Sequence, residues 1–110
     1  MNPTTVKEFF QLLPSRLDSD AAEDLDAVYQ FDLSGAQGGQ YILTICERTC
    51  HVVEGMHAAP HVVLSMTGED CMKVLRGQLS GTAVAMSGRL KISGDIGLAM
   101  RLKGLFPTVG

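Results

Sequence analysis

Cysteine and histidine, two of the side chains best suited to bind transition metals, gather in one short segment of the chain. Five of them lie within sixteen residues: Cys46, Cys50, His51, His57 and His61. The surrounding sequence is prone to form strands, and consecutive strand residues such as Cys50 and His51 point to opposite faces. The spacing also matches none of the ligand patterns of structural zinc sites. We therefore expect no metal site.

Cys46 and Cys50 also bear on redox chemistry. They flank the tripeptide ERT (47–49), with strand-prone sequence on either side, and this predicts a hairpin with a three-residue loop. Such a loop would set the two cysteines opposite each other, at a separation compatible with a disulfide. Thiols are usually reduced in the cytosol. Free thiols are therefore favoured, and the disulfide is left open as the alternative.

Catalytic motifs are scarce. No serine lies in a G-x-S-x-G elbow, and the glycines between residues 77 and 104 match neither of the common phosphate-binding patterns. His61 and Asp95 are the only candidates for an acid or base near the apolar C-terminal sequence, and neither has a visible activating partner. We predict that the chain is not an enzyme and holds no cofactor. A small lipid hydrolase or isomerase is the least favoured reading.

The elements that must position these residues follow from the spacing of apolar residues. Thr5 and Glu8 form a capping box before a helical pattern. Pro14 is expected to end that helix, and caps at Thr67 and Asp95 begin two further helices. The expected order is a helix from 6, strands 28–33, 41–46, 50–53 and 61–66, a helix between 67 and 77, a strand 89–93 and a helix 95–106. This order predicts an α+β fold in one domain, 1–110.

The expected last helix, 95–106, is apolar around nearly its whole circumference. Only Arg101 and Lys103 interrupt its apolar surface. A surface helix of a globular domain normally carries a single apolar face. The helix therefore needs a second apolar neighbour besides its own core, which could be a bound lipid, a partner subunit or a membrane.

Charge is distributed unevenly along the chain. The net charge is −3, but residues 1–72 carry three bases against eleven acids, whereas residues 73–110 carry six bases against Asp95 alone. The six are Lys73, Arg76, Arg89, Lys91, Arg101 and Lys103. A basic, apolar region suits a ligand with an anionic head, although a solvated basic face is equally expected. Nucleic acid is a poor partner because the net charge is negative and aromatic residues make up only 5%.

Three segments resemble the sterol carrier protein 2 (SCP-2) domain: VYQFDLSG (28–35), VVLSMTGEDCMKVLRGQLSG (62–81) and SGRLKISGDIGLAMRL (87–102). The third is the most specific, because it sets glycines, bases and an acid before an apolar helix. The resemblance implies a five-stranded mixed, largely antiparallel sheet that helices cover on one face, with an internal apolar tunnel. It also implies that the tunnel accepts sterols, fatty acids, fatty acyl-CoA or isoprenoid-type lipids.

We therefore predict a lipid carrier whose cavity lies between the sheet and the helices that begin at Thr67 and Asp95. Its expected lining is Met66, Leu75, Leu79, Val84, Met86, Ile92, Ile96, Met100 and Phe106. Any single aliphatic residue of this kind is more often plain core. A basic rim of Arg89, Lys91, Arg101 and Lys103 is expected to favour anionic head groups or membrane surfaces. Lys91 is the strongest candidate, because it lies between Gly88 and Gly94 on the strand that leads into the last helix, and alternation sets it on one strand face with Arg89.

The alternative is an interaction or accessory module that supports a lipid or quinone biosynthesis enzyme. In this alternative the last helix contacts a biosynthetic partner or a second copy of the chain, and a homodimer would form through Met100 and Leu105.

The cytoplasm is the expected location. The start of the sequence lacks a basic region followed by an apolar core, no apolar run approaches the ~18 residues of a membrane span, and the last residues lack a Ser-Lys-Leu ending.

Overall fold

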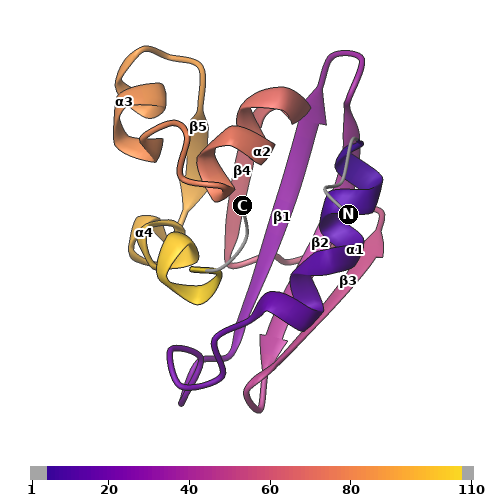
Figure 1. Ribbon diagram of the computed structural model, residues 1–110, viewed down its shortest axis with the longest axis vertical. Coiled ribbons are helices and arrows are strands. Elements are labelled where there is room, and N and C mark those ends of the chain that lie inside the picture. Colours follow the sequence, from indigo (N-terminus) through magenta and orange to yellow (C-terminus); the bar gives the residue numbers. More distant parts are fainter. Residues whose placement is uncertain (1–4, 108–110) are drawn as a thin grey trace.

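Residues 5–107, which the computed structural model describes, form a five-stranded sheet and four helices (Figure 1). The elements are α1 Val6–Arg16, β1 Ala27–Ser34, β2 Gly39–Cys46, β3 Thr49–Glu54, β4 Val62–Thr67, α2 Gly68–Leu75, α3 Gly81–Met86, β5 Lys91–Gly94 and α4 Ile96–Leu105. Residues 1–4 and 108–110 of the expected domain lie outside the described range, as do the last residues considered for targeting.

The sheet has the strand order β3-β2-β1-β4-β5. Its central strands β1 and β4 run parallel, with Phe31 opposite Leu64, and the other neighbouring pairs are antiparallel. The helices lie together on one face of the sheet (Figure 1). The predicted α+β class and the mixed, largely antiparallel sheet covered on one face are therefore confirmed.

The core lies between the helices and the sheet face that they cover. In β1 the alternation of side chains directs Tyr29, Phe31 and Leu33 toward the helices, and each is at most 5% exposed. Phe10 of α1 stacks on the ring of Tyr41 in β2, with ring centroids 4.5 Å apart. This aromatic cluster fixes α1 against one half of the sheet, and the other half is left to α2, α3 and α4.

The first helix begins where the capping box predicts but ends later. Thr5 Oγ1 accepts a hydrogen bond from the backbone N–H of Glu8 (3.2 Å), as a cap requires. The helix then continues through Pro14 to Arg16. Pro14 costs the helix one N–H donor, and only two helical residues follow it, while burial of the apolar face keeps the helix on the sheet.

The hairpin between β2 and β3 has a two-residue turn, which corrects the predicted three-residue loop. Glu47 and Arg48 form the turn with φ values of 52° and 62°, the left-handed geometry that a tight hairpin needs. Cys46 therefore pairs with Thr49, and Cys50 pairs with Ile45. The two cysteines do not face each other, because this one-residue change in register turns them to opposite faces of the sheet.

We expect one of the three thiols to react rapidly with a thiol reagent in the folded protein. Cys46 is exposed, whereas Cys50 and Cys71 are buried, and burial raises the pKa of Cys50 to about 12. A hydrogen bond with Asp26 raises the pKa of Cys46, so labelling should accelerate with pH beyond the range of an ordinary thiol. Titration with dithiobis(nitrobenzoate) before and after denaturation measures this. The variant Cys46→Ser should lose the fast phase, and fast labelling that survives in it would contradict the assignment.

A short helix and a turn precede β5, and the sequence pattern did not reveal them. The uncharged stretch before Gly88 contains α3, which Ser80 caps by accepting a hydrogen bond from the N–H of Ala83 (3.3 Å). After α3, the N–H groups of both Arg89 and Leu90 donate to the carbonyl of Val84. The chain is still turning at Arg89, so β5 begins at Lys91 rather than at residue 89.

Candidate functional site

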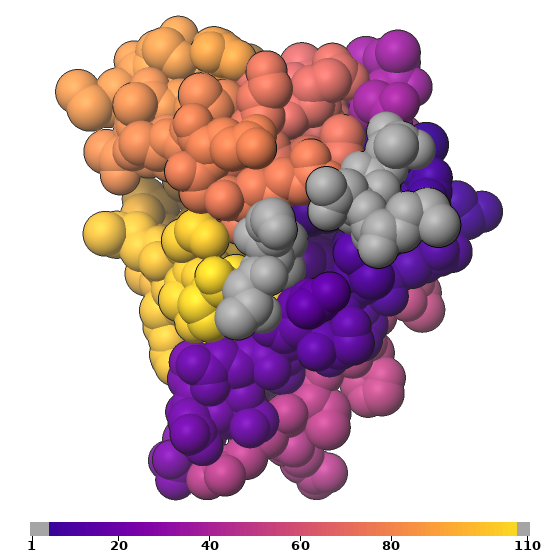
Figure 2. Space-filling view, viewed as in Figure 1, coloured from indigo at the N-terminus to yellow at the C-terminus, as the bar shows by residue number. Residues whose placement is uncertain are grey.

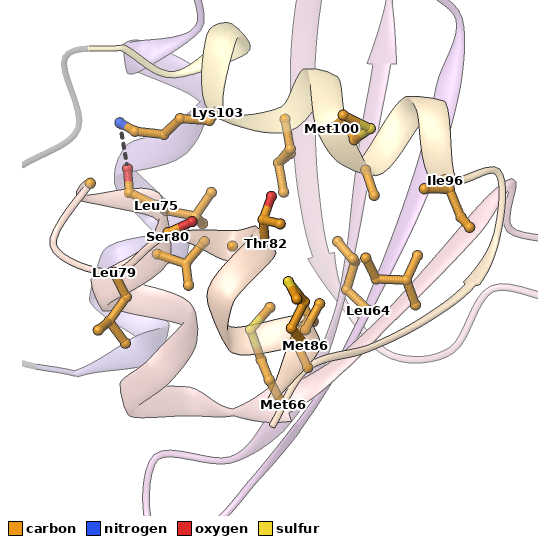
Figure 3. A pocket seen from close by; sticks show the side chains of 18 residues that line it. Leu64, Met66, Leu75, Leu79, Ser80, Thr82, Met86, Ile96, Met100 and Lys103 are labelled. Atoms are coloured by element: carbon orange, nitrogen blue, oxygen red, sulfur yellow. Dashed lines mark hydrogen bonds between the residues drawn. The ribbon is translucent and has the colours of Figure 1, made fainter. Parts of the chain in front are cut away.

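A cavity of about 790 Å³ lies between the sheet and the helices α2, α3 and α4 (Figure 3). Strands β4 and β5 provide its floor. Its lining consists of Leu64, Met66, Val74, Leu75, Gly77, Leu79, Ser80, Gly81, Thr82, Ala85, Met86, Leu90, Ile92, Ile96, Ala99, Met100, Leu102 and Lys103. Aliphatic and thioether side chains dominate this set, and such walls adapt readily to the shape of an apolar ligand.

Seven of the nine predicted lining residues face this cavity. They are Met66, Leu75, Leu79, Met86, Ile92, Ile96 and Met100. Val84 and Phe106 do not line it, which corrects the prediction; both are buried elsewhere in the packed core. Apolar spacing marks a residue as inward-facing, but it does not distinguish core from cavity wall. A role of the seven in binding stays a prediction.

The cavity opens between α3 and α4. Met86, Ile96 and Met100, which we call the mouth residues, line the cavity and yet are 84%, 58% and 76% exposed. Exposed large apolar side chains grouped in this way are typical of a binding surface. The apolar surface that the sequence predicts for the last helix is thus exposed at the cavity mouth, where Ile96 and Met100 lie.

The space-filling view shows how the segments that contain α2, α3 and α4 are arranged in the molecule (Figure 2). The segments that contain α2 and α3 form the upper part of the molecule in this view, and α4 lies directly below them. The acidic segment before β1 lies below α4. The guanidinium of Arg101 donates a hydrogen bond to this segment, at the carbonyl of Ala21 (3.2 Å).

Of the four predicted rim cations, Lys103 alone lines the cavity. Lys91 pairs with Ser65 in the sheet, whereas the neighbouring pair Ile92 and Leu64 lines the cavity. Because neighbouring strand residues point to opposite faces, Lys91 lies on the far side of the sheet. Its predicted place at the rim is therefore wrong, whereas Arg101 does not line the cavity and donates to the acidic segment.

Arg89 serves a different purpose from the one predicted. Its guanidinium forms a bidentate ion pair with the carboxylate of Asp70, in which Nε lies 3.1 Å from Oδ2. The side chain of Asp70 is only 7% exposed, whereas that of Arg89 is 54% exposed. The pair connects the first turn of α2 to the segment before β5, and it thereby holds two walls of the cavity together.

The sheet also holds α4 in place, through Tyr29. The phenol of Tyr29 donates a hydrogen bond to the carbonyl of Leu98 (2.8 Å). Burial raises the pKa of Tyr29 to about 12, with Arg101 lowering and Asp95 raising it to smaller extents. The hydroxyl therefore stays protonated, and remains a donor, over the whole physiological pH range.

The two candidate acid and base groups have structural contacts and do not line the cavity. Asp95 Oδ1 accepts from the N–H of Leu98 (3.2 Å) and so caps α4, as the sequence predicts. His61 Nδ1 accepts from the N–H of Val28 (2.9 Å). Neither placement favours the hydrolase or isomerase reading.

Strand β5, which ends directly before Asp95, depends on a glycine. Gly94 has a φ of +99°, and a Cβ atom there would lie 2.5 Å from the carbonyl oxygen of His61. Any larger residue would push β5 away from β4. The glycine in the SCP-2-like motif therefore serves the close approach of two strands that form the cavity floor.

Within residues 5–107, no three histidine, cysteine or acidic side chains are grouped closely enough to hold a metal ion. In the same range no helix is both long and apolar enough to cross a bilayer.

Sequence reasoning missed several lining residues, and some of them had a detectable signal. Leu64 lies two residues before Met66 on the same strand, so alternation places both on one face. Ala85 and Ala99, on α3 and α4, gave no such signal. Small residues are common in helices, and only their positions across the cavity show that they leave room there.

Comparisons with known proteins agree with this geometry. Residues 6–107 match the sequence profile of the SCP-2 sterol transfer family. Hydroxysteroid dehydrogenase-like protein 2 of Rattus norvegicus is 39% identical over 101 residues, which cover 91% of this chain but 19% of that protein. The chain thus spans about a fifth of the length of this curated relative.

Two solved structures share the fold over nearly their whole length. One is UbiJ-SCP2, described as a ubiquinone synthesis protein, with 22% identity, a TM-score of 0.78 and coverage of 96% of this chain and 95% of that one. The other is palmitated SCP2L2 from Aedes aegypti, with 21% identity, a TM-score of 0.72 and coverage of 94% and 95%. At these identities the likeness establishes the fold.

Proposed function

The chain belongs to the SCP-2 sterol transfer family, and we propose that it binds a lipid in the cavity and carries it, or presents it to an enzyme, without catalysing a reaction. The ligand would be a sterol, a fatty acid, a fatty acyl-CoA or an isoprenoid-type lipid. The observation that carries this proposal is the apolar cavity itself, about 790 Å³ in volume and open at the mouth residues.

The size and chemistry of the cavity support a ligand site over a packing defect. Small-molecule sites commonly measure about 300–1,000 Å³ and are mostly apolar with a few polar groups. At about 24 cal/mol per Å³, a sealed dry void of 790 Å³ would cost about 19 kcal/mol. This exceeds the roughly 5–15 kcal/mol that keep a typical domain folded. An opening to solvent or ligand is therefore required, and the mouth residues supply one.

Presentation to an enzyme is the second candidate, and the comparisons favour it in one respect. The rat relative carries the matching segment as a fifth of a longer chain with a dehydrogenase-like name, and UbiJ-SCP2 is named for ubiquinone synthesis. A homodimer through α4 would use Ile96 and Met100, the mouth residues on that helix. Leu105, which the sequence suggested for that contact, is 1% exposed and lies in the core.

We expect the protein purified from cells to carry lipid at up to one molecule per chain. Native mass spectrometry, followed by organic extraction and lipid identification, measures the ligand and its stoichiometry. The physical reason is that an apolar ligand gains about 25 cal/mol for each Å² of apolar surface removed from water. Absence of any copurifying lipid, together with no binding of a fluorescent fatty acid, would contradict the proposal.

A further inference from the structure

We propose that Lys103 makes the cavity selective for amphiphiles with an anionic head group, by donating hydrogen bonds to a carboxylate or another oxyanion. This inference rests on the proposed lipid binding and narrows the ligand to one chemical class. Three of the four basic residues that the sequence suggested for this task are engaged elsewhere or lie on the far side of the sheet, so Lys103 alone remains.

The side chain of Lys103 is held in place at one end of the cavity. Its Nζ donates to the carbonyl oxygen of Leu75, 3.1 Å away, in the last residue of α2 (Figure 3). Its stem lies over Gly77, where a Cβ atom would be 3.4 Å from Cε of Lys103. Carbonyl groups at a helix C-terminus attract a cation. The ammonium is thus positioned before any ligand arrives.

The charge of Lys103 is available to a ligand. Among residues 5–107, no carboxylate lies within 4.0 Å of its Nζ, and the predicted rim cation Arg89 pairs with Asp70 instead. An ammonium has three N–H donors, and the contact with Leu75 occupies one of them. Two donors therefore remain for an oxyanion, without loss of the contact that positions the side chain.

The rest of the lining is arranged as an amphiphile would need. Lys103 is the one charged side chain among the described lining residues, and Ser80 and Thr82 are the only hydroxyls. Ser80 Oγ already accepts from the N–H of Ala83, so its own O–H is free to donate. Leu64 and Ile96 lie away from Lys103 at the other side of the cavity (Figure 3). A ligand can therefore place its head at Lys103 and its chain along the strands.

The test compares two ligands of equal chain length, palmitate and the neutral hexadecanol, in displacing the uncharged dye Nile red at low ionic strength. Replacing Lys103 by methionine keeps the unbranched stem and removes the ammonium. We expect Lys103→Met to weaken palmitate about tenfold, the lower end for a hydrogen bond to a charged group, and to change hexadecanol less than about twofold. The variant Lys103→Arg should retain most of the preference.

Lys91→Met is the matched control, because it removes the same charge from the opposite side of the sheet. It should leave the palmitate-to-hexadecanol ratio unchanged. The role of Lys103 would be overturned if Lys103→Met left the palmitate-to-hexadecanol ratio unchanged, even with both ligands weakened. It would also be overturned if Lys91→Met had the same effect as Lys103→Met. Lipid binding itself would survive either result. If neither ligand displaces the dye from the wild-type protein, the proposed function itself fails.

Discussion

Replacing Ala99 by phenylalanine is expected to lower the affinity for a lipid about fiftyfold while the protein stays folded. Ala99 lies on α4 and lines the cavity, half-buried. A phenyl ring there would occupy space that the ligand needs. If the ring displaces three methylene groups of the ligand, the binding free energy falls by about 0.8 kcal/mol for each. The sum corresponds to an affinity about fiftyfold lower. Displacement of Nile red, together with thermal unfolding, measures both effects.

Ala83→Phe provides the control for this substitution. Ala83 lies on α3, is exposed and does not line the cavity. The same change of side chain there should leave affinity within about twofold of wild type, since surface substitutions usually have small effects. Because the ring of Ala99→Phe enters open space rather than a packed core, little overpacking penalty is expected. Unaltered lipid affinity in Ala99→Phe would show that ligands bind elsewhere.

The ion pair between Arg89 and Asp70 is expected to have the largest effect on stability among the polar contacts. Arg89→Gln should lower the free energy of unfolding by about 2 kcal/mol, because it leaves a buried carboxylate without its cation. This is below the usual 3–5 kcal/mol for a fully buried pair, since the side chain of Arg89 is 54% exposed. Urea denaturation followed by circular dichroism measures the change.

A double-mutant cycle separates the pair from other contributions. In the Arg89→Gln background, Asp70→Asn replaces the unpaired carboxylate by a neutral amide, so the double variant should be more stable than Arg89→Gln alone. Lys91→Gln, an exposed cation two residues along, should change stability by less than about 0.5 kcal/mol. If Arg89→Gln behaves like Lys91→Gln, the ion pair does not hold the cavity walls together.

The local elements of this protein follow from short-range patterns. Apolar residues at helical spacing predicted the buried face of α1, and Thr67 and Asp95 cap α2 and α4 as their positions suggested. These features depend on residues three or four positions apart, so the sequence specifies them directly. The parallel pairing of β1 with β4 joins segments about thirty residues apart, and the family resemblance supplied what spacing alone did not.

The errors in the predicted site also have a common cause. Alternation says that Lys91 and Ile92 lie on opposite faces, but it does not say which face meets the helices. That choice depends on the pairing of β5 with β4, which turns Ile92 toward Leu64 and the cavity. The backbone N–H of Arg89 donates to the carbonyl of Val84, so Arg89 lies in the turn after α3 and not in β5. Its charge then meets Asp70, nineteen residues earlier in the chain.

The sequence by itself determined an apolar C-terminal region, its caps and seven of the side chains that line the cavity, because hydrophobicity and spacing are properties of each segment alone. The tertiary structure decided which inward-facing residues are packed core, as Val84 and Phe106 are, and which border open space. It also decided that Lys103, and not Lys91, meets that space. Both outcomes depend on how separate elements pack across the cavity, and no local pattern encodes a distance between elements that are remote in the chain.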